Sequence, residues 1–268
     1  MPNITANGIN HHYEQQGSGE PLILIPYLAA DNACYAFQVA EYAKHFTCIS
    51  LDLRGTGETA SSEEPYSTEN LADDVAEVMA ALRIERAHVM GLSLGAAVGM
   101  WLAAKHRDRV ASLSLHSGWD RSDPFLKTVV QGWQVMAGGL SDVAGMVTQG
   151  IFPWCFTPEL YAARPEYIES LADFVRGRPR QTLEAFILQS GAVIEHDATA
   201  VLSSIAAPTQ ITFGRHDLVT STRFAQPLTQ AIPASELHVF EDCSHAPIYE
   251  NIAAFNEVSL AFLKRHAG

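Results

Sequence analysis

The sequence predicts an α/β fold built on a mostly parallel sheet with helices on both faces. Short apolar runs alternate along the chain with longer segments of helical pattern, which is typical of parallel sheets. Residues 87–102 show this alternation most clearly, as a strand, a tight turn and a helix. The chain has 268 residues, of which 47% are hydrophobic, so it can bury a sizeable core.

The first clear strand covers residues 22–25, Leu-Ile-Leu-Ile, and leads into a loop that begins Pro26-Tyr27-Leu28. Residues 110–115 and 209–214 read as two later strands, and residues 236–240 read as a fourth. A continuous apolar run of this length, bounded by turn residues, is consistent with a buried strand.

A serine stands at the apex of the turn Gly91-Leu92-Ser93-Leu94-Gly95. The flanking glycines are expected because side chains there would clash with the neighbouring strand and helix. The helix N-terminus beneath the serine favours developing negative charge. Two alternatives are a chance pentapeptide and a membrane span over residues 87–104. The span is interrupted by three glycines and is short against the roughly 20 residues that a membrane requires.

A base and an acid follow the serine in the chain. Asp217 comes just after the strand 209–214, and His245 lies on the loop after the strand 236–240. A serine hydroxyl is a weak nucleophile until a histidine, oriented by a carboxylate, takes its proton. We therefore predict Ser93, Asp217 and His245 as the catalytic residues, with Asp120 or Asp123 as the next candidates for the acid.

With this order of serine, acid and histidine, the chain resembles the α/β-hydrolase fold family over nearly its full length. Residues 52–59 match that family's D-x-R-G-x-G-x-S turn, with threonine as the last residue, and residues 251–264 resemble its closing helix. The resemblance implies a mostly parallel, eight-stranded-type sheet with a helical cap inserted after the sixth strand. It assigns residues 1–118 and 193–268 to the core and residues 119–192 to the cap.

The resemblance also implies an oxyanion hole formed by the backbone N–H groups of Leu28 and Leu94. The sequence departs from the family here, because Pro26-Tyr27 stands where His-Gly is usual. Two interpretations of Tyr27 are open. Its hydroxyl either donates a hydrogen bond into the substrate pocket, or its ring packs against the cap.

The expected cap, from about residue 119 to 192, has a helical pattern broken at Gly138-Gly139 and at four prolines, Pro153, Pro158, Pro165 and Pro179. Trp133 and Trp154 are expected to line the substrate pocket. The cap also carries four arginines, of which one could grip a substrate carboxylate, with Arg164 as our candidate. The alternative is ordinary surface charge; the four are Arg164, Arg176, Arg178 and Arg180.

Within the family, the chain looks most like the 3-oxoadipate enol-lactonase and small-ester hydrolase group, because residues 156–161 resemble a recurring cap element. This implies acyl transfer from an ester or lactone to water, with no cofactor and no metal. One alternative is hydrolysis of a C–C bond in a β-diketone-like substrate with the same three residues. Another is a non-catalytic ligand-binding protein on the same scaffold.

The net charge of −13 disfavours nucleic acid and anionic membranes as partners, because both require a basic face. The resemblance implies a small-molecule ester or lactone as the partner. Residues 1–7 show no signal peptide, and no metal-ligand spacing stands out. The cysteines lack close pairing and are interpreted as reduced residues of a cytoplasmic protein; they are Cys34, Cys48, Cys155 and Cys243.

Overall fold

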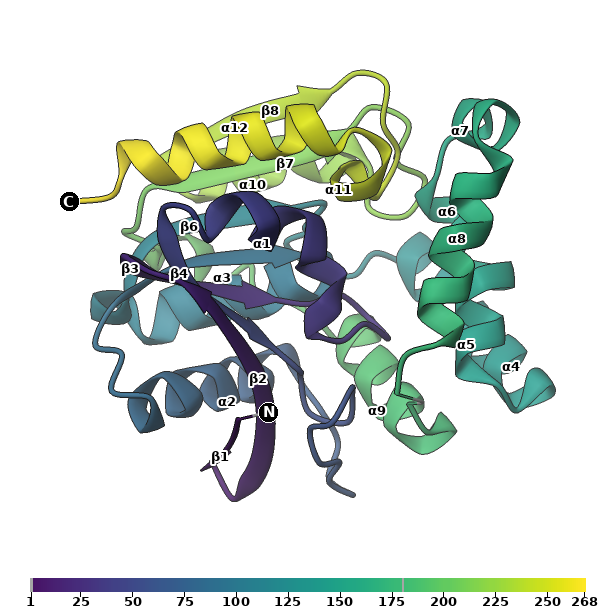
Figure 1. Ribbon diagram of the computed structural model, residues 1–268, viewed down its shortest axis with the longest axis horizontal. Helices are drawn as coiled ribbons and strands as arrows, with labels where there is room; N and C mark the ends of the chain where they lie inside the picture. Colours follow the sequence, from purple (N-terminus) through teal and green to yellow (C-terminus); the bar gives the residue numbers. More distant parts are fainter. Residues whose placement is uncertain (1, 180) are drawn as a thin grey trace.

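The computed structural model describes residues 2–179 and 181–268, and within these residues eight strands form one sheet (Figure 1). The strand order is β1-β2-β4-β3-β5-β6-β7-β8, antiparallel for the pairs β1/β2 and β2/β4 and parallel for the rest. This confirms the predicted mostly parallel, eight-stranded sheet. The strands are β1 (Asn3–Ala6), β2 (Ile9–Gly17), β3 (Glu20–Ile25), β4 (Phe46–Leu51), β5 (Ala87–Leu92), β6 (Val110–His116), β7 (Thr209–Gly214) and β8 (Ser235–Phe240).

Helices cover both faces of the sheet, as Figure 1 shows. On one face α1 contacts α12, and on the other α2 contacts α3. These core helices are α1 (Ala36–Tyr42), α2 (Thr68–Ala81), α3 (Leu94–Lys105), α10 (Ala225–Ala231), α11 (Pro247–Glu250) and α12 (Ile252–Arg265). Short 3₁₀ segments accompany them: η1 (Asn32–Tyr35), η2 (Arg107–Arg109), η4 (Leu202–Ser204) and η5 (Thr222–Phe224).

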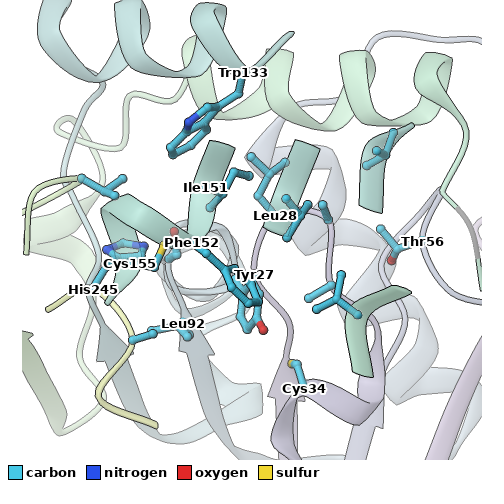
Figure 2. Close-up of a pocket in the computed structure, with 18 of the residues that line it drawn as sticks. Tyr27, Leu28, Cys34, Thr56, Leu92, Trp133, Ile151, Phe152, Cys155 and His245 are labelled. Atoms are coloured by element: carbon cyan, nitrogen blue, oxygen red, sulfur yellow. The ribbon is translucent and has the colours of Figure 1, made fainter. Parts of the chain in front are cut away.

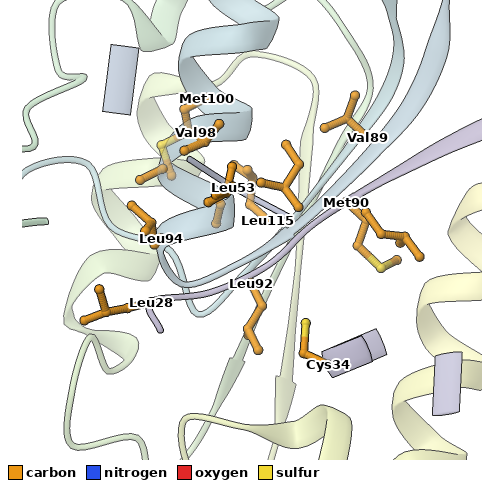
Figure 3. Packing of buried hydrophobic residues seen from close by; sticks show 14 of the residues in the cluster. Leu28, Cys34, Leu53, Val89, Met90, Leu92, Leu94, Val98, Met100 and Leu115 are labelled. Atoms are coloured by element: carbon orange, nitrogen blue, oxygen red, sulfur yellow. The ribbon is translucent and has the colours of Figure 1, made fainter. Parts of the chain in front are cut away.

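Buried hydrophobic residues of α3 pack on the centre of the sheet (Figure 3). All six residues of β5 are buried, as expected for a parallel strand covered on both faces. A Cβ on Gly99 of α3 would lie 3.2 Å from Leu113 Cδ1 and 3.7 Å from Leu115 Cδ2 of β6, so the helix sits close to the strand. Each fully buried Leu or Val side chain contributes roughly 1.5–3 kcal/mol. The turn between β5 and α3 is therefore supported on both sides by elements that are packed in the hydrophobic core.

A helical cap is inserted between β6 and β7, as predicted, and lies beside the core in Figure 1. Its last helix ends at Ile194, two residues beyond the expected boundary at 192. Prolines stand in the first turns of α4, α6, α7 and α8, where their missing N–H costs little. The segments are α4 (Pro124–Leu140), α5 (Val143–Met146), the π-helical η3 (Val147–Ile151), α6 (Phe152–Cys155), α7 (Pro158–Ala163), α8 (Pro165–Arg176) and α9 (Leu183–Ile194).

One expected break in the cap is wrong. Gly138 and Gly139 do not interrupt the helix, because α4 continues to Leu140. Its C-cap residue is Ser141, which has a positive φ of 50°. Glycine in a helix costs about 1 kcal/mol relative to alanine, which the rest of a 17-residue helix can absorb. No helix of residues 2–179 and 181–268 is long and apolar enough to cross a membrane.

Candidate active site

Ser93 occupies a strained position between β5 and α3, with φ of 53° and ψ of −117°. Such backbone angles cost of order 1–3 kcal/mol in a non-glycine residue. Two close approaches hold the turn in this shape. A Cβ on Gly91 would lie 2.1 Å from the carbonyl oxygen of Gly95, and a Cβ on Gly95 would lie 2.1 Å from that of Ile25. The predicted need for glycine at both positions is confirmed.

Asp217 lies on the turn after β7 and is almost fully buried. Its Oδ1 accepts hydrogen bonds from the N–H groups of Val219 (2.7 Å) and Thr220 (3.1 Å), and its Oδ2 accepts one from Thr220 Oγ1 (2.9 Å). Burial by itself would raise the pKa of this carboxyl. His245 and these hydrogen bonds outweigh burial and hold the pKa of Asp217 below its usual range, so the group is ionised.

His245 and Asp217 form a direct pair, with 2.9 Å between Nδ1 of the histidine and Oδ2 of the aspartate. Since an ionised carboxylate can only accept, Nδ1 carries the proton and Nε2 is left as the basic nitrogen. Ser117 Oγ donates to the backbone carbonyl of His245 at 2.9 Å, which fixes the loop from the β6 side. The imidazole is therefore held in the tautomer that a general base requires.

The two alternative acids do not occupy this position. Asp123 caps the N-terminus of α4 by accepting the Leu126 N–H, and it pairs with Arg223 at 2.8 Å. The carbonyl oxygen of Asp120 accepts the N–H of Ala198. Asp217 is the aspartate that the fold brings to His245.

Ser93 and Thr220 line the same cavity as His245 and Cys155. Figure 2 shows His245 and Cys155 at one end of the cavity. The cavity volume is about 120 Å³, which is close to the space that encloses a single aromatic ring. Its walls come from both the core and the cap and are mainly apolar; they include Tyr27, Leu126, Val130, Trp133, Ile151 and Phe152.

The two backbone groups expected to form the oxyanion hole come from separate elements. Leu94 is the first residue of α3, where helix N–H groups have no intrahelical partner. Leu28 belongs to the loop after β3, in which Ala29 has a φ of 60° and donates its N–H to Gln189 Oε1. Within residues 2–179 and 181–268, no acceptor is hydrogen-bonded to either leucine N–H. Both groups are thus free to bind a ligand oxygen.

The structure contradicts one interpretation of Tyr27, the one in which its hydroxyl donates a hydrogen bond into the pocket. Its ring lines the cavity, but its hydroxyl lies 2.9 Å from the hydroxyl of Tyr249 on α11. Tyr249 donates its own proton to the carbonyl of Cys34, so Tyr27 is the donor to Tyr249. The hydroxyl therefore points its proton at the core rather than at a ligand or the cap.

The cap residues expected at the pocket separate into two groups. Trp133 lines the cavity, with its Nε1–H donated to the carbonyl of Gly150. Trp154 and Arg164 do not line it, contrary to expectation. The Trp154 ring packs against Phe125 with 6.5 Å between centroids, and the exposed Arg164 guanidinium stacks over Tyr167. Trp154 is partly buried in α6, and Arg164 lies between α7 and α8, so the helical pattern alone did not define where either side chain points.

The other three cap arginines also differ from one another. Arg176 is exposed and pairs with Glu169 and Asp173 on its own helix. Arg178 lines the cavity, as does its partner Asp31. Arg180 lies outside the described residues. Nothing in the sequence distinguished Arg178 from its neighbours, whereas Thr220 could have been suspected from its position three residues after Asp217.

Comparisons with known proteins agree with this architecture. A family model described as "alpha/beta hydrolase fold" matches residues 8–252. A protein of Caulobacter sp. (strain K31), named "Putative carbamate hydrolase RutD", is 26% identical, with the alignment covering 100% of both chains. The 3-oxoadipate enol-lactonase 2 of Acinetobacter baylyi is 28% identical, covering 98% of this chain and 96% of its own.

Among solved structures, the enol-lactonase from Burkholderia xenovorans LB400 superposes with a TM-score of 0.88 at 28% identity. The match covers 98% of this chain and 100% of that one. The family match therefore extends over most of the sequence, and the mostly parallel eight-stranded sheet with its helices agrees with it. The chain belongs to the α/β-hydrolase fold family.

Proposed function

We propose that this protein is a serine hydrolase that cleaves a carboxylic ester or lactone by acyl transfer to water. The observation that carries the proposal is the buried pair of His245 and Asp217, 2.9 Å apart, in one cavity with the strained Ser93. A non-catalytic binding protein would have no need of this arrangement. Relatives named as enol-lactonases support an ester or lactone, and relatives named as putative carbamate hydrolases make a carbamate the competing bond.

In the first half of the reaction, Ser93 Oγ attacks the substrate carbonyl while His245 Nε2 takes the hydroxyl proton. Asp217 stabilises the imidazolium that results. The N–H groups of Leu28 and Leu94 donate to the oxyanion of the tetrahedral intermediate, in a site where burial strengthens electrostatic interactions. His245 then gives its proton to the leaving oxygen, which leaves an acyl group on Ser93.

In the second half, His245 removes a proton from water, and the resulting hydroxide attacks the acyl carbonyl. Collapse of the second tetrahedral intermediate breaks the bond to Ser93 Oγ, which regains its proton from His245. With a lactone substrate the leaving oxygen stays attached to the acyl group, so the ring opens to a single product. The small apolar cavity favours short or compact acyl groups.

An organophosphonate probe tests the nucleophile, because attachment requires an activated serine. We expect one phosphonyl group on Ser93, located by peptide mass spectrometry, and no label on Ser93→Ala. Chromogenic esters, lactones, carbamates and β-diketones then test the bond that is cleaved. If Ser93 is labelled but only the carbamates or only the β-diketones are turned over, the ester and lactone assignment is rejected. If Ser93 is not labelled, the serine mechanism is rejected.

A further inference from the structure

The cavity has a second end, which is polar. In Figure 2 its lining extends from His245 past Tyr27 and Leu28 to Thr56 on the opposite side. Asp31, Arg178 and Gln181 also line the cavity. Gln181 donates from Nε2 to the carbonyl of Gly55, the residue before Thr56, so the cap segment that carries Arg178 and Gln181 lies against this end.

Asp31 holds Arg178 in place. The Nε of Arg178 donates to Asp31 Oδ2 at 2.7 Å, and the N–H of Ala33 donates to Asp31 Oδ1 at 3.1 Å. The aspartate side chain is only 6% exposed, whereas the arginine side chain is 36% exposed. The carboxylate is thus an anchored, buried group, and the guanidinium is the partner that reaches open space.

Most of the hydrogen-bonding capacity of Arg178 is unused. A guanidinium has five N–H donors, and Asp31 takes only the one on Nε. Neither Nη nitrogen has a hydrogen-bond acceptor among the described residues. The edge formed by the two Nη groups matches the planar, two-oxygen geometry of a carboxylate. Arg176, by contrast, already binds Glu169 and Asp173.

Two buried amide atoms also lack partners, one on Gln181, which lines the cavity, and one on Gln189, which is hydrogen-bonded to Gln181. Gln189 Oε1 accepts from the N–H of Ala29 and from Gln181 Nε2, which fixes the orientation of both amides. Gln189 Nε2 and Gln181 Oε1 are then left buried without a hydrogen bond. A buried polar group without a partner is costly, so this end of the cavity is suited to a polar ligand or to water.

We propose that Arg178 anchors a subsite for a carboxylate group, so that the preferred substrates are esters or lactones with a carboxylate at the end remote from the reacting carbonyl. Asp31 is the positioning residue of this subsite. The inference rests on the proposed function, because Ser93 must attack the other end of the same molecule. The competing interpretation is that the ion pair of Asp31 and Arg178 only fastens the cap to the core.

A matched pair of substrates separates the two interpretations: the mono-4-nitrophenyl ester of glutaric acid, and the same ester with its free carboxylate methylated. We expect Arg178→Gln to raise KM for the acid by about tenfold or more, and to leave KM for the methyl ester within about twofold. Arg178→Lys should recover part of the loss, because it keeps the charge but not the planar fork. Arg176→Gln is the matched control and should change KM for neither substrate.

Asp31→Asn separates a carboxylate subsite from an ion pair that only joins the cap to the core. Asparagine can accept only one of the two N–H groups that Asp31 binds, so Arg178 loses its orienting partner but keeps its charge. KM for the acid should therefore rise by less than in Arg178→Gln, and KM for the methyl ester should stay within about twofold. If the pair only fastens the cap, Asp31→Asn and Arg178→Gln should have the same effect on both substrates. That result would overturn the subsite.

Two controls keep this test independent of folding and of the proposed function. Glutarate should inhibit wild-type hydrolysis of the methyl ester competitively, whereas the neutral glutaramide should not, and this measurement needs no variant. Equal inhibition by the two would also reject the subsite. Failure of the organophosphonate to label wild-type Ser93 would reject the serine hydrolase itself, whereas labelling with no preference for the acid would reject the carboxylate subsite alone.

Discussion

Glu250 connects the cap to the loop that carries the candidate base: its Oε1 accepts the N–H of Thr157, the N-cap of α7, at 2.7 Å. Its Oε2 accepts the N–H of Ser244, the residue before His245. On either side of the histidine, two further bonds run to the cap, from Ser244 Oγ to the carbonyl of Trp154 and from the Ala246 N–H to that of Cys155. The cap therefore helps to position His245 as well as enclosing the cavity.

Replacing Glu250 with glutamine should lower kcat by about tenfold with little change in KM. The amide can accept one N–H, but its Nε2 would face the other, so the His245 loop must shift. Steady-state kinetics on a neutral ester would measure this. Glu241→Gln is the matched control, because Glu241 is exposed on the same loop and, among the described residues, its side chain is hydrogen-bonded to Arg215 alone. Equal kcat values for the two variants would show that the contact with Glu250 does not position the base.

The predicted triad should act as a unit. Ser93→Ala, His245→Ala and Asp217→Asn should each lose about three to four orders of magnitude in kcat, and any double variant should lose little more. Asp123→Asn is the control, since that aspartate pairs with Arg223 instead. An Asp217→Asn enzyme with near-normal turnover would reject Asp217 as the acid.

The serine turn can be tested by adding a single methyl group. Gly95→Ala places a Cβ 2.1 Å from the Ile25 carbonyl oxygen, so the free energy of unfolding should fall by at least about 1–3 kcal/mol, and activity with it. Gly138→Ala is the matched substitution in an exposed helix with open space around it, and it should stabilise by about 0.5–1 kcal/mol. Urea unfolding would compare the stabilities of the two variants. An unchanged free energy of unfolding for Gly95→Ala would mean that the loop after β3 can move to make room for the methyl group.

The elements that local pattern defines could be predicted from the sequence. The strand before Ser93, the glycines around it and the loops that carry Asp217 and His245 each depend on neighbours within a few residues. Contacts between distant segments could not be predicted. Tyr27 and Tyr249 are 222 positions apart, and Asp31 and Arg178 are 147 apart. The predictions for Trp154 and Arg164 were wrong for a related reason, because the side chains of short cap segments that reach the cavity depend on how the whole cap packs on the core.

The hydroxyl of Tyr27 should matter for stability rather than for catalysis. It donates to Tyr249 and not towards the cavity, so Tyr27→Phe should lower the free energy of unfolding by about 0.5–1.5 kcal/mol and leave kcat within about twofold. Chemical denaturation and ester turnover, measured on one preparation, would check both parts. A fall in kcat of a hundredfold or more would instead assign the hydroxyl to the oxyanion.

His196 should make the protein less stable in mild acid. It lies just beyond α9, at the return of the chain from the cap, where Thr68 Oγ1 donates to Nδ1 at 2.8 Å and Nε2–H donates to the Trp119 carbonyl at 3.1 Å. Burial lowers the pKa of His196 to about 4, against smaller opposing effects of the Trp119 carbonyl and Asp197. The unfolded chain, with a histidine pKa of about 6.5, therefore binds a proton that the folded protein resists.

Above about pH 7.5 the ring is neutral in both states and contributes no pH dependence. As the pH falls from about 6.5 to about 4, this one group should lower the free energy of unfolding by about 3 kcal/mol. His196→Gln should be less stable at pH 7 but should lose less on acidification. The exposed His45→Gln should follow the wild type. Urea unfolding at half-unit pH steps would measure the slopes, and parallel wild-type and His196→Gln curves would show that another group causes the acid sensitivity.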